Sequence, residues 1–154
     1  MSGHAFDRST FLPGAALEEV WRAVSSWEGV NAELAPVRMS HPSAYGNLES
    51  IPADGRSHMT STLTVFGLPF DRHRFALHAC VPGSHFHEES SNFLLRRWVH
   101  RRTLEARDGG VQVTDHCELE PRLALLGGLL RASYEGVFDR RHARLRARFP
   151  GPGD

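Results

Sequence analysis

The sequence contains no lysine, so all eighteen of its basic residues are arginine. This absence excludes enzymes that form a Schiff base through lysine, and it excludes the phosphate-binding lysine of a P-loop. Eighteen acidic residues balance the arginines, so no net charge draws the chain onto nucleic acid or an anionic membrane. We therefore expect no nucleic-acid partner.

Cysteines and long apolar runs are also scarce. The two cysteines, Cys80 and Cys117, are too few for a disulfide framework. No apolar run approaches the roughly 20 residues of a membrane-spanning helix, and the first residues lack the charged and apolar regions of a secretory signal. We expect a cytoplasmic protein with reduced thiols and no integral membrane contact.

The remaining composition is that of a folded domain. Hydrophobic residues make up 40% of the 154 residues and charged residues 23%, which is ordinary for globular proteins. A chain of this length can bury one core but is too short to divide comfortably into two. We expect a single domain over residues 1–154, present as a monomer or a homodimer.

The first part of the chain predicts a strand followed by two short helices. His4–Leu12 alternates in polarity and is rich in β-branched and aromatic residues, which is typical of a strand. The next apolar positions are spaced as on one face of a helix: Leu17, Val20, Trp21 and Val24. A second helix is predicted over Gly29–Leu34, because Pro36 stops it.

The middle of the chain predicts an antiparallel meander of six further strands. The helical period disappears there, and turns that contain glycine or proline recur at short intervals. The predicted strands are Val37–His41, His58–Phe66, Phe70–Val81, His85–Ser90, Leu94–Ala106 and Val111–Glu120. The predicted turns are Gly67–Pro69, Pro82–Ser84 and Asp108–Gly110, and Pro42–Gly55 is predicted to be a mobile loop.

The end of the chain predicts one long helix. Its apolar positions stay near one helical face from Leu123 to Phe149. Gly127 and Gly128 weaken the first turns, so we expect the regular part to begin near Leu129. Together the elements indicate an α+β class, with a seven-stranded antiparallel sheet, two short helices after its first strand and a long C-terminal helix.

Several short motifs resemble those of a known superfamily. They are the strand and helix Phe6–Leu12 and Leu17–Trp21, the strand pair Trp98–Arg102 and Val113–Asp115, and the helix end Arg140–His142 with Leu145. On these motifs the chain resembles the START and birch-pollen-allergen-like (SRPBCC) helix-grip superfamily, of the polyketide cyclase/dehydrase and lipid-transport type. The resemblance implies a curved sheet that wraps the last helix and a role in binding hydrophobic molecules such as lipids or polyketides.

The sharpest candidate site lies on the last two predicted strands. If Arg107–Gly110 is a four-residue turn, three pairs share one face: Arg102 with Asp115, His100 with Cys117, and Trp98 with Leu119. A two-residue turn at Gly109–Gly110 would instead place Arg102 opposite Cys117. Because an unpaired charge inside a protein costs about 3–5 kcal/mol, a buried Arg102 needs a carboxylate, and Asp115 is the natural partner.

This group of side chains has two interpretations. In the first, Arg102 and Asp115 anchor a polar group inside an apolar cavity, and His100 orients or protonates a ligand carbonyl or hydroxyl. In the second, Arg102 and Asp115 form a structural salt bridge that fixes the strand register, with a satisfied histidine beside it. The sequence leaves both open.

The opposed faces of sheet and helix predict a cavity for a small hydrophobic or amphipathic molecule. The predicted binding residues are Trp98, His100, Arg102, Asp115, Tyr134, Leu63, Phe75, Leu130 and Val137. An alternative is a polyketide cyclase or dehydratase, in which His100 is the general acid or base and Asp115 sets its environment. His100 and Asp115 are therefore the candidate catalytic residues.

Two further clusters carry weaker signals. His85 and His87 share one strand face with Glu89, which is ligand-like chemistry, but no HExxH or CxxC motif accompanies them, so we expect no metal and no cofactor. The C-terminal arginine run is interpreted as a solvated face with one or two inward salt bridges; it comprises Arg140, Arg141, Arg144, Arg146 and Arg148, with His142 among them. The alternative is a module that binds an acidic partner through Arg140 and Arg144.

Overall fold

The first strand and the two helices follow the predicted apolar pattern. In the computed structural model, which describes residues 3–152, they are β1 (His4–Pro13), α1 (Leu17–Ser25) and α2 (Trp27–Leu34). Val20 and Val24 are fully buried on the inner face of α1. Helix α2 begins before its predicted start at Gly29, because the Ser26 hydroxyl accepts a hydrogen bond from the Gly29 N–H at 3.0 Å and caps the helix.

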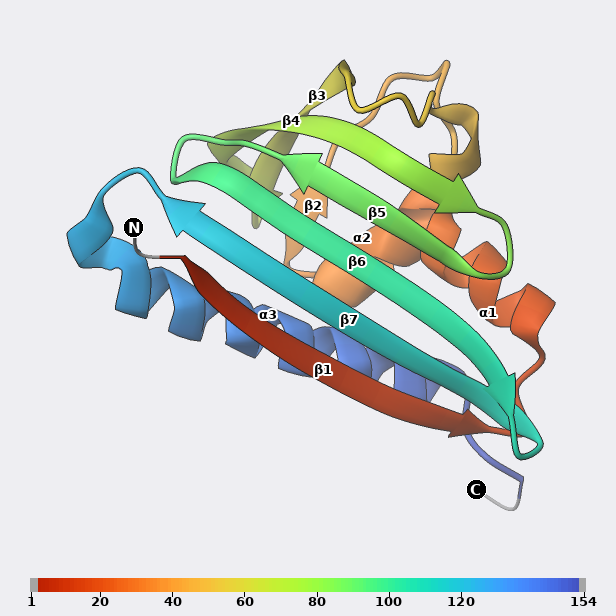
Figure 1. Ribbon diagram of the computed structural model, residues 1–154. Coiled ribbons are helices and arrows are strands. Elements are labelled where there is room, and N and C mark those ends of the chain that lie inside the picture. The colour runs from red at the N-terminus through yellow and green to blue at the C-terminus, as the bar shows by residue number, and fades with distance from the viewer. Residues whose placement is uncertain (1–2, 153–154) are drawn as a thin grey trace.

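Seven antiparallel strands form one curved sheet, in the order β1-β7-β6-β5-β4-β3-β2 (Figure 1). The strands after β1 are β2 (Val37–Met39), β3 (Ser57–Val65), β4 (Leu68–Val81), β5 (His85–Ser90), β6 (Leu95–Arg107) and β7 (Gly110–Pro121). Phe66 and Gly67 have positive φ and connect β3 to β4 as a two-residue turn, which matches the twist of the strands. This turn lies one residue earlier than the predicted Gly67–Pro69, so Leu68 already belongs to β4.

The long helix α3 (Gly127–Arg148) lies across one face of the sheet and packs against β1, β7 and α2 (Figure 1). A short 3-10 turn, η2 (Ala124–Leu126), leads into it, and α3 begins before its expected start at Leu129. Within residues 3–152, no helix is both long enough and apolar enough to span a membrane. This arrangement is the helix-grip fold, an α+β architecture that agrees with the sequence-based prediction.

Two groups of buried apolar side chains form the core. The first includes Trp27 and Phe75 and lies between the short helices and the sheet. The second includes Trp98 and Phe138 and lies under α3. The interior of the fold is therefore mainly apolar.

The predicted loop Pro42–Gly55 is anchored rather than loosely attached. It contains a short 3-10 turn, η1 (Leu48–Ser50). Leu48 and Ile51 are 2% and 3% exposed and join the first core group. Their burial ties the loop to the sheet and to the short helices.

Candidate ligand-binding site

Strands β6 and β7 pair in the first of the two predicted registers. Arg102 lies opposite Asp115, and His100 lies opposite Cys117. The alternative with a turn at Gly109–Gly110 is wrong, because Gly110 already belongs to β7. All four of the paired side chains are buried on the face that meets α3.

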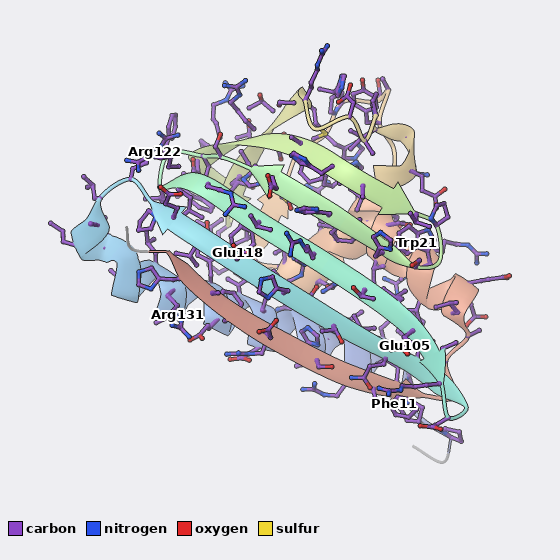
Figure 2. All side chains as sticks on the ribbon, viewed as in Figure 1. Phe11, Trp21, Glu105, Glu118, Arg122 and Arg131 are labelled. Atoms are coloured by element: carbon purple, nitrogen blue, oxygen red, sulfur yellow. The ribbon has the colours of Figure 1, made fainter. Side chains whose placement is uncertain are left out.

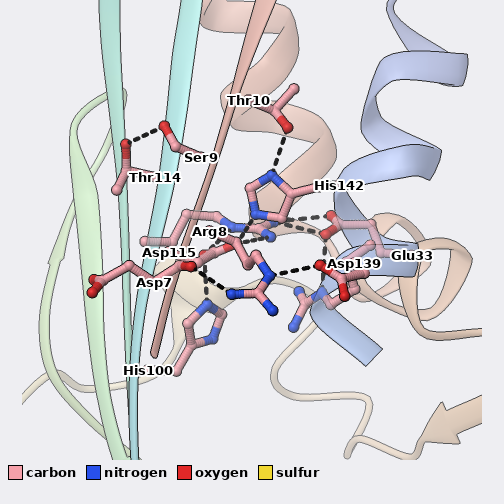
Figure 3. A network of polar contacts seen from close by, with 12 residues as sticks. Asp7, Arg8, Ser9, Thr10, Glu33, His100, Thr114, Asp115, Asp139 and His142 are labelled. Atoms are coloured by element: carbon pink, nitrogen blue, oxygen red, sulfur yellow. Dashed lines mark hydrogen bonds and ion pairs between the residues drawn. The ribbon is translucent and has the colours of Figure 1, made fainter. Parts of the chain in front are cut away.

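Arg102 and Asp115 form a fully enclosed ion pair, and Figure 3 shows Asp115 in contact with His100 and His142. Arg102 Nε and Nη2 donate to the two carboxylate oxygens of Asp115, each at 2.7 Å. Arg102 Nη1 donates to both oxygens of Glu33 on α2, at 2.8 and 3.1 Å. Burial opposes the charge of the guanidinium, but the two carboxylates outweigh it and raise the pKa of Arg102.

Helix α3 completes this network with Arg141 and His142. Arg141 Nε donates to Glu33 Oε1 at 3.0 Å, and His142 Nε2 lies 2.7 Å from Asp115 Oδ2. The other nitrogen of the same ring, Nδ1, lies 2.8 Å from the Thr10 hydroxyl on β1. Arg141 forms one of the inward salt bridges that the arginine run predicted. Its partner Glu33 and the neighbouring His142 could not be predicted, because no pattern in the sequence relates α2 and α3 to β7.

Asp115 is the centre of the network and uses both of its oxygens fully. Its Oδ1 contacts Arg102 and His100, and its Oδ2 contacts Arg102 and His142, all at 2.7 Å. Burial opposes its charge, but Arg102 and His100 hold the pKa of Asp115 well below its usual value.

Burial lowers the pKa of His100, so this ring is neutral near pH 7. Its proton lies on Nε2, facing the carboxylate, and Nδ1 keeps a lone pair.

A second buried polar group belongs to β4, β5 and the loop after β5. Glu88 Oε2 accepts hydrogen bonds from His73 Nε2 and the Ser90 hydroxyl, both at 2.6 Å. Its other oxygen, Oε1, lies 3.9 Å from His100 Nδ1. Asn92 Nδ2 lies 3.2 Å from His73 Nδ1. Burial opposes the ionisation of Glu88, but the contact with His73 prevails and lowers the pKa of this carboxyl.

These groups meet at a cavity of about 290 Å³ between the sheet and α3. Six of the predicted binding residues line it: Leu63, Trp98, His100, Leu130, Tyr134 and Val137. The other three do not. Arg102 and Asp115 lie behind the cavity wall, where Asp115 contacts His100. Phe75 lies in the first core group, where its ring centroid is 5.6 Å from that of Trp27.

Several residues that line the cavity were not predicted to do so, although one of them, Glu88, could have been predicted from the sequence. They include His73, Glu88, Asn92 and Arg141. Along β5 the burial alternates, so Glu88 faces inward while His85 and His87 face outward. Because side chains alternate along any strand, the outward histidines already place Glu88 on the inner face.

Aromatic rings form much of the cavity wall beside His100. The ring centroid of Trp98 lies 4.8 Å from that of Tyr134, and the ring centroid of Phe138 lies 4.9 Å from that of His100. Burial raises the pKa of Tyr134 to about 12, so its hydroxyl stays protonated. The aromatic part of the wall therefore combines apolar surface with the neutral hydroxyl of Tyr134.

Two of the apolar side chains that line the cavity are also exposed. Phe70 and Leu94 line it and are 47% and 37% exposed. The start of β4 and the loop before β6 are tied together, since the Phe93 N–H donates to Asp71 and the Arg122 N–H donates to the Leu94 carbonyl. Phe66, Leu68, Phe93, Leu123, Leu125 and Leu129 are exposed as well, but they do not line the cavity.

The histidines on β5 belong to the outer face of the sheet. Figure 2 shows Glu105 and Glu118 on this face, pointing away from α3. His87 lies there beside Glu89, with 3.4 Å between Nε2 and Oε1. Among residues 3–152, no three His, Cys, Asp or Glu side chains are grouped so as to hold a metal ion.

The C-terminal arginines are held by the fold to a greater extent than predicted. Arg141 pairs with Glu33, Arg144 Nη1 donates to the Glu33 carbonyl at 2.8 Å, and Arg146 Nη1 donates to the Thr10 hydroxyl at 2.9 Å. These contacts connect α3 to α2 and β1. Three arginines of the run therefore have a structural role.

Comparison with known proteins identifies one family model. It is described as "Domain of unknown function (DUF8410)" and matches residues 14–149. The sequences of curated proteins include no match. The model covers most of the chain, from the end of β1 to the end of α3.

Solved structures with the same fold are START/Bet v1-like proteins. A START superfamily protein from Mycobacterium smegmatis has a TM-score of 0.70 at 12% identity, over 95% of this chain and 97% of that one. DynU16, from the dynemicin biosynthetic locus, has a TM-score of 0.61 at 16% identity, over 95% and 48%. The di-domain ARO/CYC protein StfQ, from the steffimycin biosynthetic pathway, has a TM-score of 0.58 at 14% identity, over 95% and 51%. The chain thus spans about half the length of the last two, and the likeness shows the fold alone.

Proposed function

We propose that this chain, which belongs to the DUF8410 family and has the START-like helix-grip fold, binds a small hydrophobic or amphipathic molecule between the sheet and α3. Proteins with this fold typically bind hydrophobic ligands. The observation that carries the proposal is the cavity of about 290 Å³, with apolar walls that include Trp98, Leu130 and Val137. Such walls favour an apolar ligand by about 25 cal/mol per Å² of surface removed from water.

The polar groups of the cavity give the ligand an orientation. His100, Glu88 and Asn92 lie on the sheet side, and Tyr134 lies on α3. The ion pair of Arg102 with Asp115 lies behind His100 and fixes the position of its ring. In this proposal, Arg102 and Asp115 support the site through His100.

The experiment compares two tryptophan substitutions on α3. Leu130 lines the cavity, whereas Leu129 is 67% exposed and points outward. We expect Leu130→Trp to fill the cavity and abolish binding of an apolar fluorescent dye, while Leu129→Trp binds the dye as the wild type does. Native mass spectrometry of the purified wild-type protein then reports any co-purified lipid or aromatic compound. Binding that survives in a folded Leu130→Trp variant would refute the proposed cavity.

A cyclase- or dehydratase-type enzyme is the second candidate function. The observation that favours it is the contact of His100 Nε2 with Asp115, which leaves Nδ1 free as a base beside the cavity. StfQ, an ARO/CYC protein with this fold, gives the candidate a parallel. With an aromatic polyketide as the test substrate, His100→Gln is expected to abolish turnover and keep binding if the protein is an enzyme. If the wild-type protein does not turn over this polyketide, the enzyme hypothesis is rejected and the binding function remains as the proposal.

A further inference from the structure

We propose that the polar group of the bound molecule is a protonated amine, held between Glu88 Oε1 and His100 Nδ1. This inference rests on the proposed binding function and adds the chemical class of the ligand. It follows from the hydrogen-bond roles of the buried side chains and from their balance of charge.

The orientation of Asn92 is the first step. Its Oδ1 accepts hydrogen bonds from the backbone N–H groups of Leu94 and Leu95, at 3.1 and 2.8 Å. Its amide nitrogen therefore faces His73 Nδ1 and donates to it at 3.2 Å. His73 Nδ1 is then an acceptor, and the single proton of the ring lies on Nε2, where it is donated to Glu88. His73 is neutral and leaves the charge of Glu88 uncompensated.

Two hydrogen-bond acceptors face each other on the cavity wall. Glu88 Oε2 is occupied by His73 and Ser90, but Oε1 accepts no hydrogen bond from the described residues. His100 donates from Nε2 to Asp115, so its Nδ1 is also an acceptor. The 3.9 Å between Oε1 and Nδ1 is too long for a hydrogen bond. A group with at least two N–H donors can satisfy both atoms.

The charge balance favours a cation over a neutral donor. Arg102 pairs with Asp115 and Glu33, and Arg141 pairs with Glu33, so two guanidinium groups balance two carboxylates. Among the described residues, Glu88 has only histidines within ion-pair distance. One negative charge therefore remains at the cavity wall, and a buried carboxylate without a cation is costly.

The surrounding side chains suit an amine on an aromatic or aliphatic body. The rings of Trp98, Tyr134 and Phe138 line the cavity, and aromatic faces attract cations. Arg141 also lines the cavity, but it pairs with Glu33 and its guanidinium lies 4.9 Å from the centre of the Phe138 ring. An anionic ligand at Arg141 is accordingly the competing outcome of the test.

The test compares three ligands that share one apolar body: 2-(1-naphthyl)ethylamine, 2-(1-naphthyl)ethanol and 1-naphthylacetic acid. Calorimetry at neutral pH is expected to show that the wild type binds the amine at least tenfold more tightly than the alcohol, and the acid most weakly. Equal affinity for amine and alcohol, or tighter binding of the acid, would overturn the inference and leave the proposed cavity function standing. Failure of all three ligands and of an apolar dye would overturn both.

Glu88→Gln removes the charge with little change in shape. We expect its affinity for the amine to fall at least tenfold, to the level of the alcohol, while its affinity for the alcohol stays within twofold of the wild type. Retained binding of the alcohol shows that the variant keeps its cavity. Glu118→Gln, on the outer face of the sheet (Figure 2), is the matched control and is expected to keep the preference for the amine. If Glu88→Gln does not fold, the three-ligand comparison on the wild type still decides the inference.

Discussion

Asp115 compensates Arg102 and orients two histidine rings, so the loss of its charge affects three buried side chains at once. We predict that Asp115→Asn lowers the free energy of unfolding by about 3–5 kcal/mol, because Arg102 would lose its main countercharge inside the protein. Urea denaturation followed by circular dichroism measures this loss. The control is Asp139→Asn, which removes an exposed carboxylate 2.6 Å from Arg8 and is expected to cost at most about 1 kcal/mol. Equal losses in the two variants would contradict the prediction.

Three pKa values that are lower in the folded state predict a loss of stability toward acid pH. His100 has its pKa below the ordinary 6.5, Glu88 below 4.5 and Asp115 below 3.8. Below each ordinary value the unfolded chain binds more protons than the folded chain, so stability falls as pH falls. The decline begins below 6.5 with His100 and steepens below 4.5 with the two carboxyl groups. Urea midpoints that stay constant from about pH 8 to about pH 4 would disprove this.

The pair of Arg102 with Asp115 could be predicted from the sequence, and its partner Glu33 could not. A tight turn sets the register of a hairpin, and the register sets which side chains lie opposite each other. The contact of Arg102 with Glu33 joins β6 to α2 across the fold. No periodic pattern in the sequence encodes the distance between Arg102 and Glu33, because this distance depends on how strongly the sheet curves.

Two glycines in helices differ in the space that an added Cβ atom would find. A Cβ on Gly29 would lie 1.7 Å from the Ala23 carbonyl oxygen, whereas a Cβ on Gly136 would meet nothing closer than Arg140 Nη1 at 3.9 Å. We predict that Gly29→Ala destabilises the protein by about 1–3 kcal/mol through overpacking. Gly136→Ala should stabilise it by about 0.5–1 kcal/mol through helix propensity. Thermal unfolding of both variants measures the two effects, and a Gly29→Ala variant as stable as the wild type would contradict the first.

The elements could be predicted more reliably than their ends. Strand alternation and the helical period locate β1, the meander and α3, since both patterns repeat over many residues. The start of α3 is different, because Gly127 lies where a Cβ would be 2.4 Å from His4 Nε2. There, close packing against the beginning of β1 overrides the low helix propensity of glycine.

The whole molecule encloses a cavity beside its second core group, so an occupant should stabilise the complete fold. We predict that a bound naphthyl amine raises the melting temperature in a concentration-dependent way, because it binds the folded chain and not the unfolded one. At a hundredfold excess over Kd the gain is about 2.7 kcal/mol. Differential scanning fluorimetry measures it, with Leu130→Trp as the control that should show no shift. An equal shift in that variant would place the amine outside the cavity.

Helix α3 is attached unevenly along its length. The second half buries Arg141, His142 and Leu145, whereas the first turn buries only Gly127 and Leu130 and leaves Leu129 67% exposed. We predict slow amide hydrogen exchange around His142 and much faster exchange around Leu129, measured by mass spectrometry. Uniform protection along the helix would contradict this. For the proposed ligand, we then predict that the dissociation rate follows local opening of the first turns of α3, while the network around Asp115 stays intact.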